Sequence, residues 1–299
     1  MEAIRNIVVA TDFSALSEAA VARALTLARL DGAAIHLVHA LSFPLLVSPY
    51  DVAIPPNVWE DLRVAARRQI EEQRQQIEAQ GVQGATAEIA ESTDATRAIA
   101  AAVEAHRADL VVMGTHGHRG VEHAILGSVA ERTLRSIERP ILAVKEDAAR
   151  AAEPIRRILL AVDFSPDSDR AVALTAGLAR RLGAHVDVVH ALDLPHDHFA
   201  SLASFGIELE QKIRTHVAEA LDAVGVELEK NGIPLTLITR PGRPSAVIAE
   251  VAQESGCQLI VMGSRGRSGL SHVLLGSVAE RTLRLAPCAV LVTRAPESE

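Results

Sequence analysis

The ten-residue sequence LGSVAERTLR occurs twice without change in this 299-residue chain, at 126–135 and at 275–284. The similarity extends beyond these ten residues, because IRNIVVATDFS at 4–14 is answered by IRRILLAVDFS at 155–165. A length of 299 residues also suits two soluble domains of ~100–200 residues each. We therefore predict two similar domains, at 1–148 and 154–296, joined by a short linker rich in Ala, Pro and charged residues.

Each half of the chain alternates short apolar runs with helical patterns. The predicted strands lie at 7–10, 35–40, 85–90, 110–113 and 141–145, and at 158–162, 186–191, 235–239, 259–262 and 289–293. The predicted helices between them lie at 18–29, 57–80, 95–106 and 129–135, and at 167–182, 207–230 and 245–255, followed by the repeated segment. Apolar strands separated by helices indicate a parallel sheet covered on both faces and connected by right-handed crossovers. The fold class is α/β, with one doubly wound parallel sheet in each half.

Composition excludes several classes of function. The net charge is −8 without a basic cluster, which argues against binding to nucleic acid or to an anionic membrane. No apolar run approaches the ~20 residues of a membrane-spanning helix, and the first residues lack a signal-peptide pattern, so we expect a cytoplasmic protein. The only cysteines, Cys257 and Cys288, predict neither a disulfide framework nor a zinc site. His196 and His198 form a weak metal pattern, and a solvated loop is the expected alternative.

Doubly wound sheets bind ligands at the carboxyl ends of their strands, near the point where the strand order reverses. The first strand of each half is followed by Thr-Asp-Phe-Ser or Val-Asp-Phe-Ser, without the glycines of a dinucleotide-binding fingerprint. No Walker A sequence is present either. The chain is thus neither a typical Rossmann dehydrogenase nor a P-loop NTPase.

The glycines follow the fourth strand instead. Gly-x-x-Gly, nine residues and Gly-Ser occur at 114–128 and again at 263–277. We expect the first glycine to let the backbone pass close to a ligand, the second to adopt a positive φ, and Gly-Ser to begin a helix with unpaired N–H groups. Such a helix N-terminus can bind phosphate without lysine. The alternative is a capping box, since Ser128 with Glu131 and Ser277 with Glu280 both fit S-x-x-E.

This pattern resembles the nucleotide-binding signature of the universal stress proteins. The likeness covers nearly the whole chain and includes Asp-Phe-Ser after the first strand, Val-His-Ala at the second and Val-Met-Gly at the fourth. It implies two universal stress protein domains, each with a five-stranded sheet in the adenine nucleotide alpha hydrolase-like order 3-2-1-4-5, paired by pseudo-twofold symmetry through their last strands. It also implies that ATP, with Mg²⁺, binds at the carboxyl ends of the strands.

The resemblance assigns a role to particular residues. Asp12 and Asp163 would meet the ribose or adenosine, and the backbone of Ala40 and Ala191 would read the adenine edge. The residues that would line the ribose are Met113, Gly114, Met262 and Gly263, and those that would hold the phosphates are Gly117, Gly127, Ser128, Val129, Gly266, Gly276, Ser277 and Val278. The alternatives are that the two aspartates are ordinary turn or helix-start residues and that the methionines fill the edge of the core.

The two copies differ beside the expected phosphates. The first loop has His116, His118 and Arg119, whereas the second has Arg265 and Arg267. Arginine keeps its charge at every physiological pH and can donate two hydrogen bonds to one phosphate, so we expect Arg265 to contact the ligand and the second domain to bind ATP more tightly or with less pH sensitivity. The alternative is that these side chains are solvated. The copies also differ after the third strand, where 92–95 is STDA and 242–245 is GRPS.

Two other histidines, His39 and His190, end matching apolar strands, and we expect them to be structural. The predicted function is a nucleotide-dependent regulatory module of the stress response that acts on an unidentified protein partner and can also form a homodimer. The alternatives are a slow ATP hydrolase or phosphoryl-transfer enzyme and a ligand-free dimerisation module.

Overall fold

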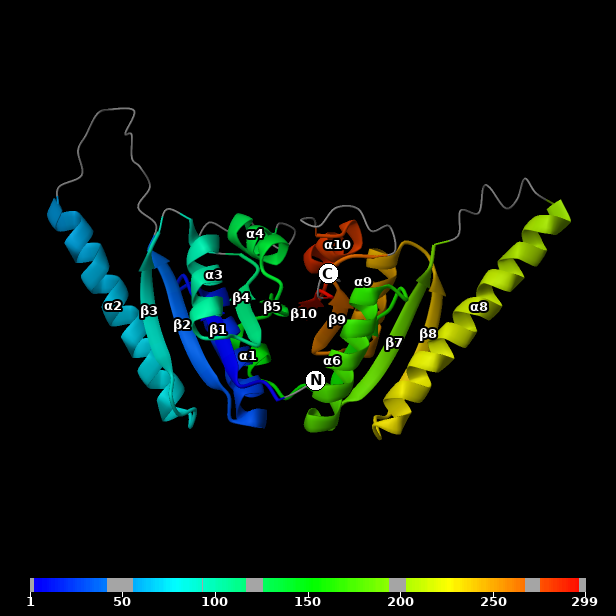
Figure 1. Ribbon diagram of the computed structural model, residues 1–299, viewed down its shortest axis with the longest axis horizontal. Helices are drawn as coiled ribbons and strands as arrows, with labels where there is room; N and C mark the ends of the chain where they lie inside the picture. The colour runs from blue at the N-terminus through cyan, green and yellow to red at the C-terminus, as the bar shows by residue number, and fades with distance from the viewer. Residues whose placement is uncertain are drawn as a thin grey trace, which may run out of the picture. The chain divides into compact units, whose positions relative to one another are not determined.

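A computed structural model describes residues 3–41, 56–92, 94–116, 126–193, 203–266 and 275–295. The chain divides into two units, Ala3–Pro154 and a second unit that begins at Ile155. Each unit is an α/β sandwich with a central sheet (Figure 1).

The elements of the first unit are β1 (Asn6–Ala10), α1 (Ala15–Asp31), β2 (Ala34–Leu41), α2 (Pro56–Ala79), β3 (Thr86–Glu91), α3 (Ala95–Ala105), β4 (Leu110–Gly114), α4 (Ser128–Ser136), β5 (Ile141–Val144) and α5 (Ala148–Ala151). Those of the second unit are β6 (Arg157–Ala161), α6 (Pro166–Leu182), β7 (His185–Leu192), α8 (Ala203–Lys230), β8 (Leu235–Pro241), α9 (Pro244–Ser255), β9 (Leu259–Gly263), α10 (Ser277–Leu285) and β10 (Ala289–Thr293). The predicted strands and helices are confirmed, apart from shifts of their ends by a few residues and the short α5, which the sequence reading missed.

Within the first unit the strand order is β3-β2-β1-β4-β5, and within the second it is β8-β7-β6-β9-β10. All of these neighbours pair in parallel. The doubly wound five-stranded fold with order 3-2-1-4-5 is thus confirmed for each unit by itself. The order reverses between β1 and β4 and between β6 and β9, and doubly wound folds bind their ligands at the carboxyl ends of the strands on either side of such a reversal.

The strands form because their residues are apolar on both faces. Ile7, Val8 and Val9 of β1 have no exposed surface, and the central strands of the second unit are buried in the same way. Helices α1 and α2 pack on strands of the sheet, and α3 packs on β1 and β2 and contacts α4. Right-handed crossovers in two directions place α1 and α2 on one face and α3 and α4 on the other. Ser14 caps the start of α1, and Gly32, with φ of 68°, ends it in the left-handed region.

The linker is folded onto the first unit. The side chains of Arg23 in α1 and Glu146 after β5 are almost fully buried, and Arg23 Nη2 donates to Glu146 Oε1 over 2.8 Å. The same guanidinium donates to the carbonyl oxygens of Arg150 and Glu153 at 3.2 and 3.0 Å. Asp147 caps the start of α5 by accepting from Arg150 N–H at 2.9 Å, and the bonds from Arg23 hold this helix on the first unit. No helix among the described residues is long and apolar enough to cross a membrane.

Candidate functional site

The residues after β1 and β6 form a tight turn around an aspartate. Asp12 Oδ1 accepts from the backbone N–H of Ser14 at 3.1 Å and from the Ser14 hydroxyl at 2.6 Å. The Ser17 hydroxyl also donates to Asp12 Oδ1. The intervening Phe13 has φ of 64°, in the left-handed region that non-glycine residues rarely adopt.

The second unit repeats this turn with Asp163, whose Oδ1 accepts from Ser165 N–H at 3.1 Å and from the Ser165 hydroxyl at 2.6 Å. Phe164 has φ of 61°. The turn reading of the two aspartates is therefore confirmed. It does not exclude a ligand role, because the bonds within each turn hold a carboxylate firmly at the carboxyl edge of the sheet.

The histidines at the ends of β2 and β7 support this turn. His39 Nδ1 donates to the carbonyl oxygen of Thr11 over 2.9 Å, and its ring stacks on Phe13 with centroids 4.3 Å apart. His190 makes the same bond to Val162 at 2.8 Å and stacks on Phe164 at 4.8 Å. The prediction that both histidines are structural is confirmed. Their hydrogen bonds and stacking contacts hold the phenylalanine of each turn in its strained backbone conformation.

The glycines that end β4 and β9 serve helix packing. A Cβ at Gly114 would lie 3.1 Å from the Cβ of Leu16, and one at Gly263 would lie 2.8 Å from the Cβ of Asp167. These glycines therefore let α1 and α6 approach the sheet closely. This packing already accounts for a glycine at both positions, and the expectation that the backbone here also passes close to a ligand stays a prediction.

The second glycine of each pattern was expected to have a positive φ. Gly266 does not lie in that region, so this expectation is wrong for the second unit. A Cβ at Gly266 would lie 2.7 Å from Asp163 Oδ2. The loop backbone at Gly266 therefore lies directly against the carboxylate of Asp163. The corresponding Gly117 lies outside the described residues.

Helices α4 and α10 begin at Gly127 and Gly276, and neither N-terminus is capped by a side chain. Ser128 and Ser277 are exposed and occupy the first helical position, so the capping-box reading is wrong in both units. The acidic members of that box pair along the helix, Glu131 with Arg135 at 2.8 Å and Glu280 with Arg284 at 2.7 Å.

The glycine at each of these N-caps has a steric reason. The N–H of Gly127 donates to the carbonyl oxygen of Thr115 over 2.8 Å, and a Cβ there would lie 2.9 Å from that oxygen. In the second unit the N–H of Gly276 donates to the carbonyl oxygen of Ser264 over 2.8 Å, and a Cβ at Gly276 would lie 2.9 Å from that oxygen. The start of the helix is thus fixed against the end of the neighbouring strand, with its first amides at the carboxyl edge.

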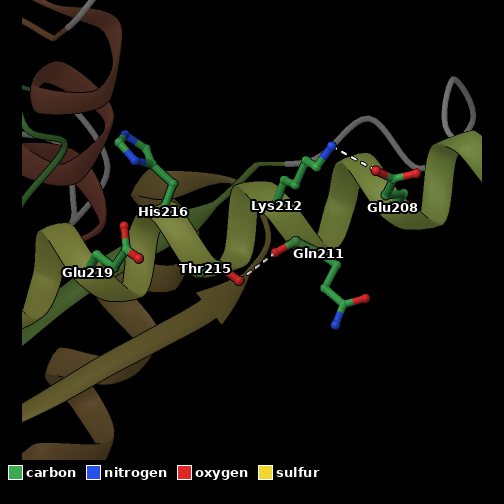
Figure 2. Close-up of a pocket in the computed structure, with 6 residues that line it drawn as sticks. All are labelled: Glu208, Gln211, Lys212, Thr215, His216 and Glu219. Carbon is green, nitrogen blue, oxygen red and sulfur yellow. Dashed lines mark hydrogen bonds and ion pairs between the residues drawn. The ribbon is translucent and has the colours of Figure 1, made fainter.

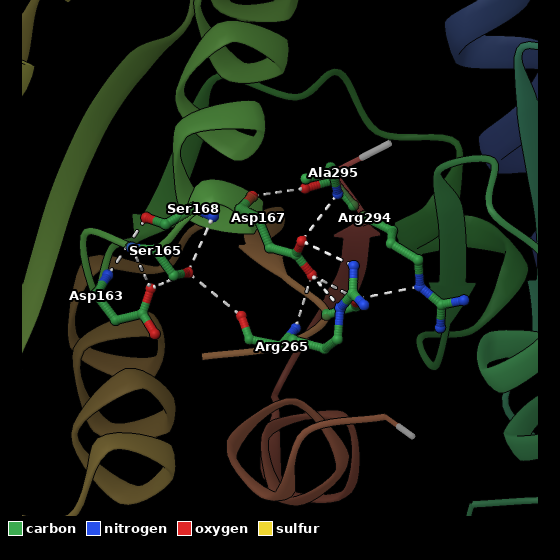
Figure 3. A network of polar contacts seen from close by, with 9 residues as sticks. Asp163, Ser165, Asp167, Ser168, Arg265, Arg294 and Ala295 are labelled. Atoms are coloured by element: carbon green, nitrogen blue, oxygen red, sulfur yellow. Dashed lines mark hydrogen bonds and ion pairs between the residues drawn. The ribbon is translucent and has the colours of Figure 1, made fainter. Parts of the chain in front are cut away.

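A buried aspartate in the second unit fixes the start of the loop after β9 (Figure 3). Asp167 is 4% exposed, and its Oδ2 accepts from the Ser264 hydroxyl at 2.7 Å and from the Arg265 backbone N–H at 3.0 Å. The Arg265 guanidinium lies 3.3 and 3.4 Å from the two carboxylate oxygens, and Ala295 N–H donates to Oδ1 over 2.9 Å. Although burial favours the neutral acid, the bonds from Ala295, Ser264 and Arg265 hold the pKa of Asp167 below its ordinary value.

This cluster changes the interpretation of Arg265. From the sequence we expected the Arg265 guanidinium to contact the phosphates of the ligand, whereas in the structure it forms an ion pair with Asp167. The first unit has Leu16 at the position of Asp167 and His116 at that of Arg265. His116 Nδ1 lies 2.9 Å from the Thr115 hydroxyl. Sequence reasoning missed Asp167, although an acidic residue in one copy opposite a leucine in the other was visible as a signal.

The two units also differ after the third strand. Asp94 caps α3 by accepting from Thr96 N–H at 3.0 Å, and Arg132 Nη1 lies 3.5 Å from Asp94 Oδ1. Helix α9 begins at Pro244 without a side-chain cap, after Gly242 with φ of 132°. The first unit therefore carries a carboxylate beside α4 that the second lacks at the corresponding place.

The remaining predicted site residues lie where the strands place them. Ala40 and Ala191 are half-buried near the carboxyl ends of β2 and β7. Met113 and Met262 are 4% and 5% exposed, which confirms that they fill the core edge. Val129 and Val278 are half-buried in the first turns of α4 and α10. The predictions for His118, Arg119, Arg267, His196 and His198 fall outside the described residues.

A shallow hollow on α8 lies apart from these edges (Figure 2). Its lining comes from one helix: Glu208, Gln211, Lys212, Thr215, His216 and Glu219. Lys212 pairs with Glu208 at 2.7 Å, as expected of a solvated helix face. We do not regard it as a binding site, because no second element contributes.

The chain matches the universal stress protein family twice, over residues 3–145 and 154–294. It therefore belongs to this family, with two family domains in one chain, as the resemblance of its motifs implied.

Individual relatives agree with this assignment. A universal stress protein of Mycobacterium tuberculosis is 30% identical over 196 residues, and the match covers 63% of either chain, less than two thirds of that relative. One from Mycolicibacterium smegmatis is 29% identical over 300 residues and 97% of each chain. The crystal structure of a universal stress protein from Archaeoglobus fulgidus covers 99% of this chain and 100% of its own, with 21% identity and a TM-score of 0.71. At this identity the last match shows the fold alone.

Proposed function

We propose that this universal stress protein binds one ATP, with Mg²⁺, at each of its two domains and acts in the cytoplasm as a nucleotide-dependent regulatory module. The observation that carries the proposal is the pair of helix N-termini at Gly127 and Gly276, which no side chain caps. Both lie at the carboxyl edge of a doubly wound sheet, where such folds bind their ligands.

The chemistry of this edge suits a polyphosphate. A helix N-terminus carries about half a positive elementary charge, and its first amides are oriented to donate to an anion. The exposed hydroxyls of Ser128 and Ser277 add a donor beside those amides and could also meet a phosphate-bound cation. Mg²⁺ would neutralise part of the phosphate charge when bound.

The aspartate turns supply the second half of a nucleotide site. The bonds to Ser14 and Ser165 involve only Oδ1 of Asp12 and Asp163, and they fix each carboxylate at the same sheet edge as the helix N-terminus. A fixed carboxylate is a suitable acceptor for ribose hydroxyls, as in other doubly wound folds. We assign the adenine edge to the backbone at Ala40 and Ala191.

The proposed regulation requires that bound nucleotide favour one conformation of the segment between Gly-x-x-Gly and Gly-Ser in each domain. A ligand shifts a conformational equilibrium only by its differential affinity for the two states. ATP bound at Gly127 or Gly276 would favour one arrangement of the loop that precedes the helix, and a protein partner could then recognise that surface.

The test adds a negative charge at the proposed phosphate position. Asp at the first position of a helix is favourable for the helix itself, so Ser128→Asp and Ser277→Asp should leave stability unchanged or slightly higher. The same charge repels phosphate, and we expect each variant to lose ATP binding at its own site by at least about tenfold, or ~1.4 kcal/mol. The neutral Ser128→Asn and Ser277→Asn variants are the matched controls.

Isothermal calorimetry with MgATP measures stoichiometry and affinity. Two sites in the native chain, one in each single Asp variant and none in the double variant would support the proposal. Unchanged binding in the double Asp variant would refute the phosphate position, and a native chain that binds no nucleotide would refute the function. Phosphate release in the same samples separates binding from hydrolysis.

A further inference from the structure

The two cysteines of the chain face each other in the second unit. Cys257 Sγ and Cys288 Sγ are 3.7 Å apart, and each residue is 1% exposed. Cys257 precedes β9 and Cys288 precedes β10, and these strands are parallel neighbours with Leu259 opposite Ala289. The thiols therefore lie at the amino ends of the two strands, at the opposite edge of the sheet from the proposed nucleotide.

Packing alone does not account for this pair. When the repeated LGSVAERTLR segments are aligned, Cys257 corresponds to Ala108 and Cys288 to Arg139 in the first unit. Ala108 has no exposed surface, so an alanine suffices to fill the first of these places in the same fold. A buried cysteine usually behaves as a small apolar residue, but two in contact can also react with each other.

The geometry favours a bond between the sulfurs. A disulfide has sulfurs about 2.05 Å apart, so they need to approach by about 1.7 Å from their present separation. The hydrogen bond with Cys288 lowers the pKa of Cys257, although burial acts in the other direction. A lower pKa means more thiolate, the form that reacts with oxidants.

We propose that Cys257 and Cys288 are a redox-active dithiol that a peroxide oxidises to an intramolecular disulfide. Cys257 sulfur attacks one peroxide oxygen, the O–O bond breaks, and the leaving hydroxide takes the thiol proton as water, which leaves a sulfenic acid. Cys288 sulfur then attacks the sulfenic sulfur and expels hydroxide, which leaves as a second water with the Cys288 proton. Two electrons pass from the sulfur pair to the peroxide, and dithiothreitol reverses the change.

The disulfide would link the two ends of the segment 257–288, which carries the proposed phosphate site of the second domain. Residues 257–288 include the whole of β9, with Gly263 at its end, Gly276 and the whole of α10. A cross-link at the amino ends of β9 and β10 restrains this segment without occupying the nucleotide edge. The inference does not depend on nucleotide binding, so its test and that of the proposed function can fail separately.

The experiment exposes the folded full-length protein to hydrogen peroxide. The reaction is stopped with acid, remaining thiols are labelled with N-ethylmaleimide in denaturant, and intact mass is measured. The variants are Cys257→Ala, which introduces the residue that the first unit has at position 108, and Cys288→Ala. Circular dichroism of each sample before the acid step confirms that the chain is folded.

The native chain should lose two hydrogen atoms, take up no maleimide and regain both labels after dithiothreitol. Each single variant should form no internal disulfide. The proposal is overturned if the native chain still takes two labels when a cysteine peptide in the same tube is fully oxidised, or if its sulfurs gain oxygen without joining. It is also overturned if the bond joins two chains or forms only after unfolding in urea.

Discussion

His36 should make the first unit sensitive to acid. The residue lies in β2 and is 8% exposed, with Nδ1 2.8 Å from the Thr86 hydroxyl and Nε2 3.2 Å from Asn6 Oδ1. The ring of His106 stacks on it with centroids 3.9 Å apart. Burial, with a smaller contribution from the charge of His106, lowers the pKa of His36 from 6.5 to about 4.

The sign of the effect follows from proton linkage. Above pH 6.5 His36 is neutral in both the folded and the unfolded chain and does not affect stability. As pH falls from 6.5 towards 4, the unfolded chain binds a proton that the folded chain does not, so the free energy of unfolding decreases. The loss is about 2 kcal/mol at pH 5 and levels off at about 3 kcal/mol below pH 4, at 1.36 kcal/mol per pKa unit.

The chain provides its own probe for this measurement. Trp59, its only tryptophan, lies in α2 of the same unit as His36. Urea titrations followed by tryptophan fluorescence at pH 7, 6 and 5 give the free energy of unfolding of this unit. We expect His36→Gln to remove about 2 kcal/mol of the difference between pH 7 and pH 5. The exposed His216→Gln is the matched control and should leave that difference unchanged.

The difference between pH values is the test, because His36→Gln also alters stability at pH 7 through its lost ring contacts. A variant with the same dependence on pH as the native chain would refute the reasoning. It would show that His36 takes up its proton in the folded state near its ordinary pKa.

Three further substitutions have defined expectations. Gly276→Ala places a Cβ 2.9 Å from the Ser264 carbonyl oxygen and should cost about 1–3 kcal/mol, measured by urea unfolding with circular dichroism. Arg23→Met leaves the carboxylate of Glu146 buried without its ion pair and should cost about 3–5 kcal/mol by tryptophan fluorescence, most of it recovered when Glu146→Leu is added. Asp167→Asn should lower the stability of the second unit by about 2 kcal/mol and weaken ATP binding there, and calorimetry that shows unchanged affinity would contradict the second part.

The repeat made the fold predictable. Two copies of the same strand and helix pattern defined the elements and the parallel sheet, since hydrophobic periodicity depends on local sequence. The linker helix α5 was missed because it has only four residues, although its N-cap Asp147 was visible in the sequence. Its bonds to Arg23, more than a hundred residues earlier in the chain, could not be read from a local pattern.

The sequence placed the proposed site at one edge of each sheet but did not show the contacts that shape this edge. The glycine spacing pointed to the helices that start at Ser128 and Ser277, but the contacts of Gly114 with Leu16 and of Gly263 with Asp167 could not be read from it. The capping box failed for a similar reason. A bond between Gly127 and the end of β4 already fixes where α4 begins, so the hydroxyl is left exposed at the first helical position. Tertiary contacts of this kind cannot be read from spacing alone.

The two domains are similar in fold and differ in the contacts of the first residues after β4 and β9. Asp167 bonds to Ser264 and Arg265 at the start of the second loop, whereas the first domain has Leu16 at that position. A pre-fixed loop loses less conformational entropy on binding, which favours tighter binding in the second domain. The sequence reading expected the same order of affinities from the charge of Arg265, but that charge is balanced by Asp167. The difference should therefore arise from rigidity, and it should persist at high salt, where a purely electrostatic advantage would be screened.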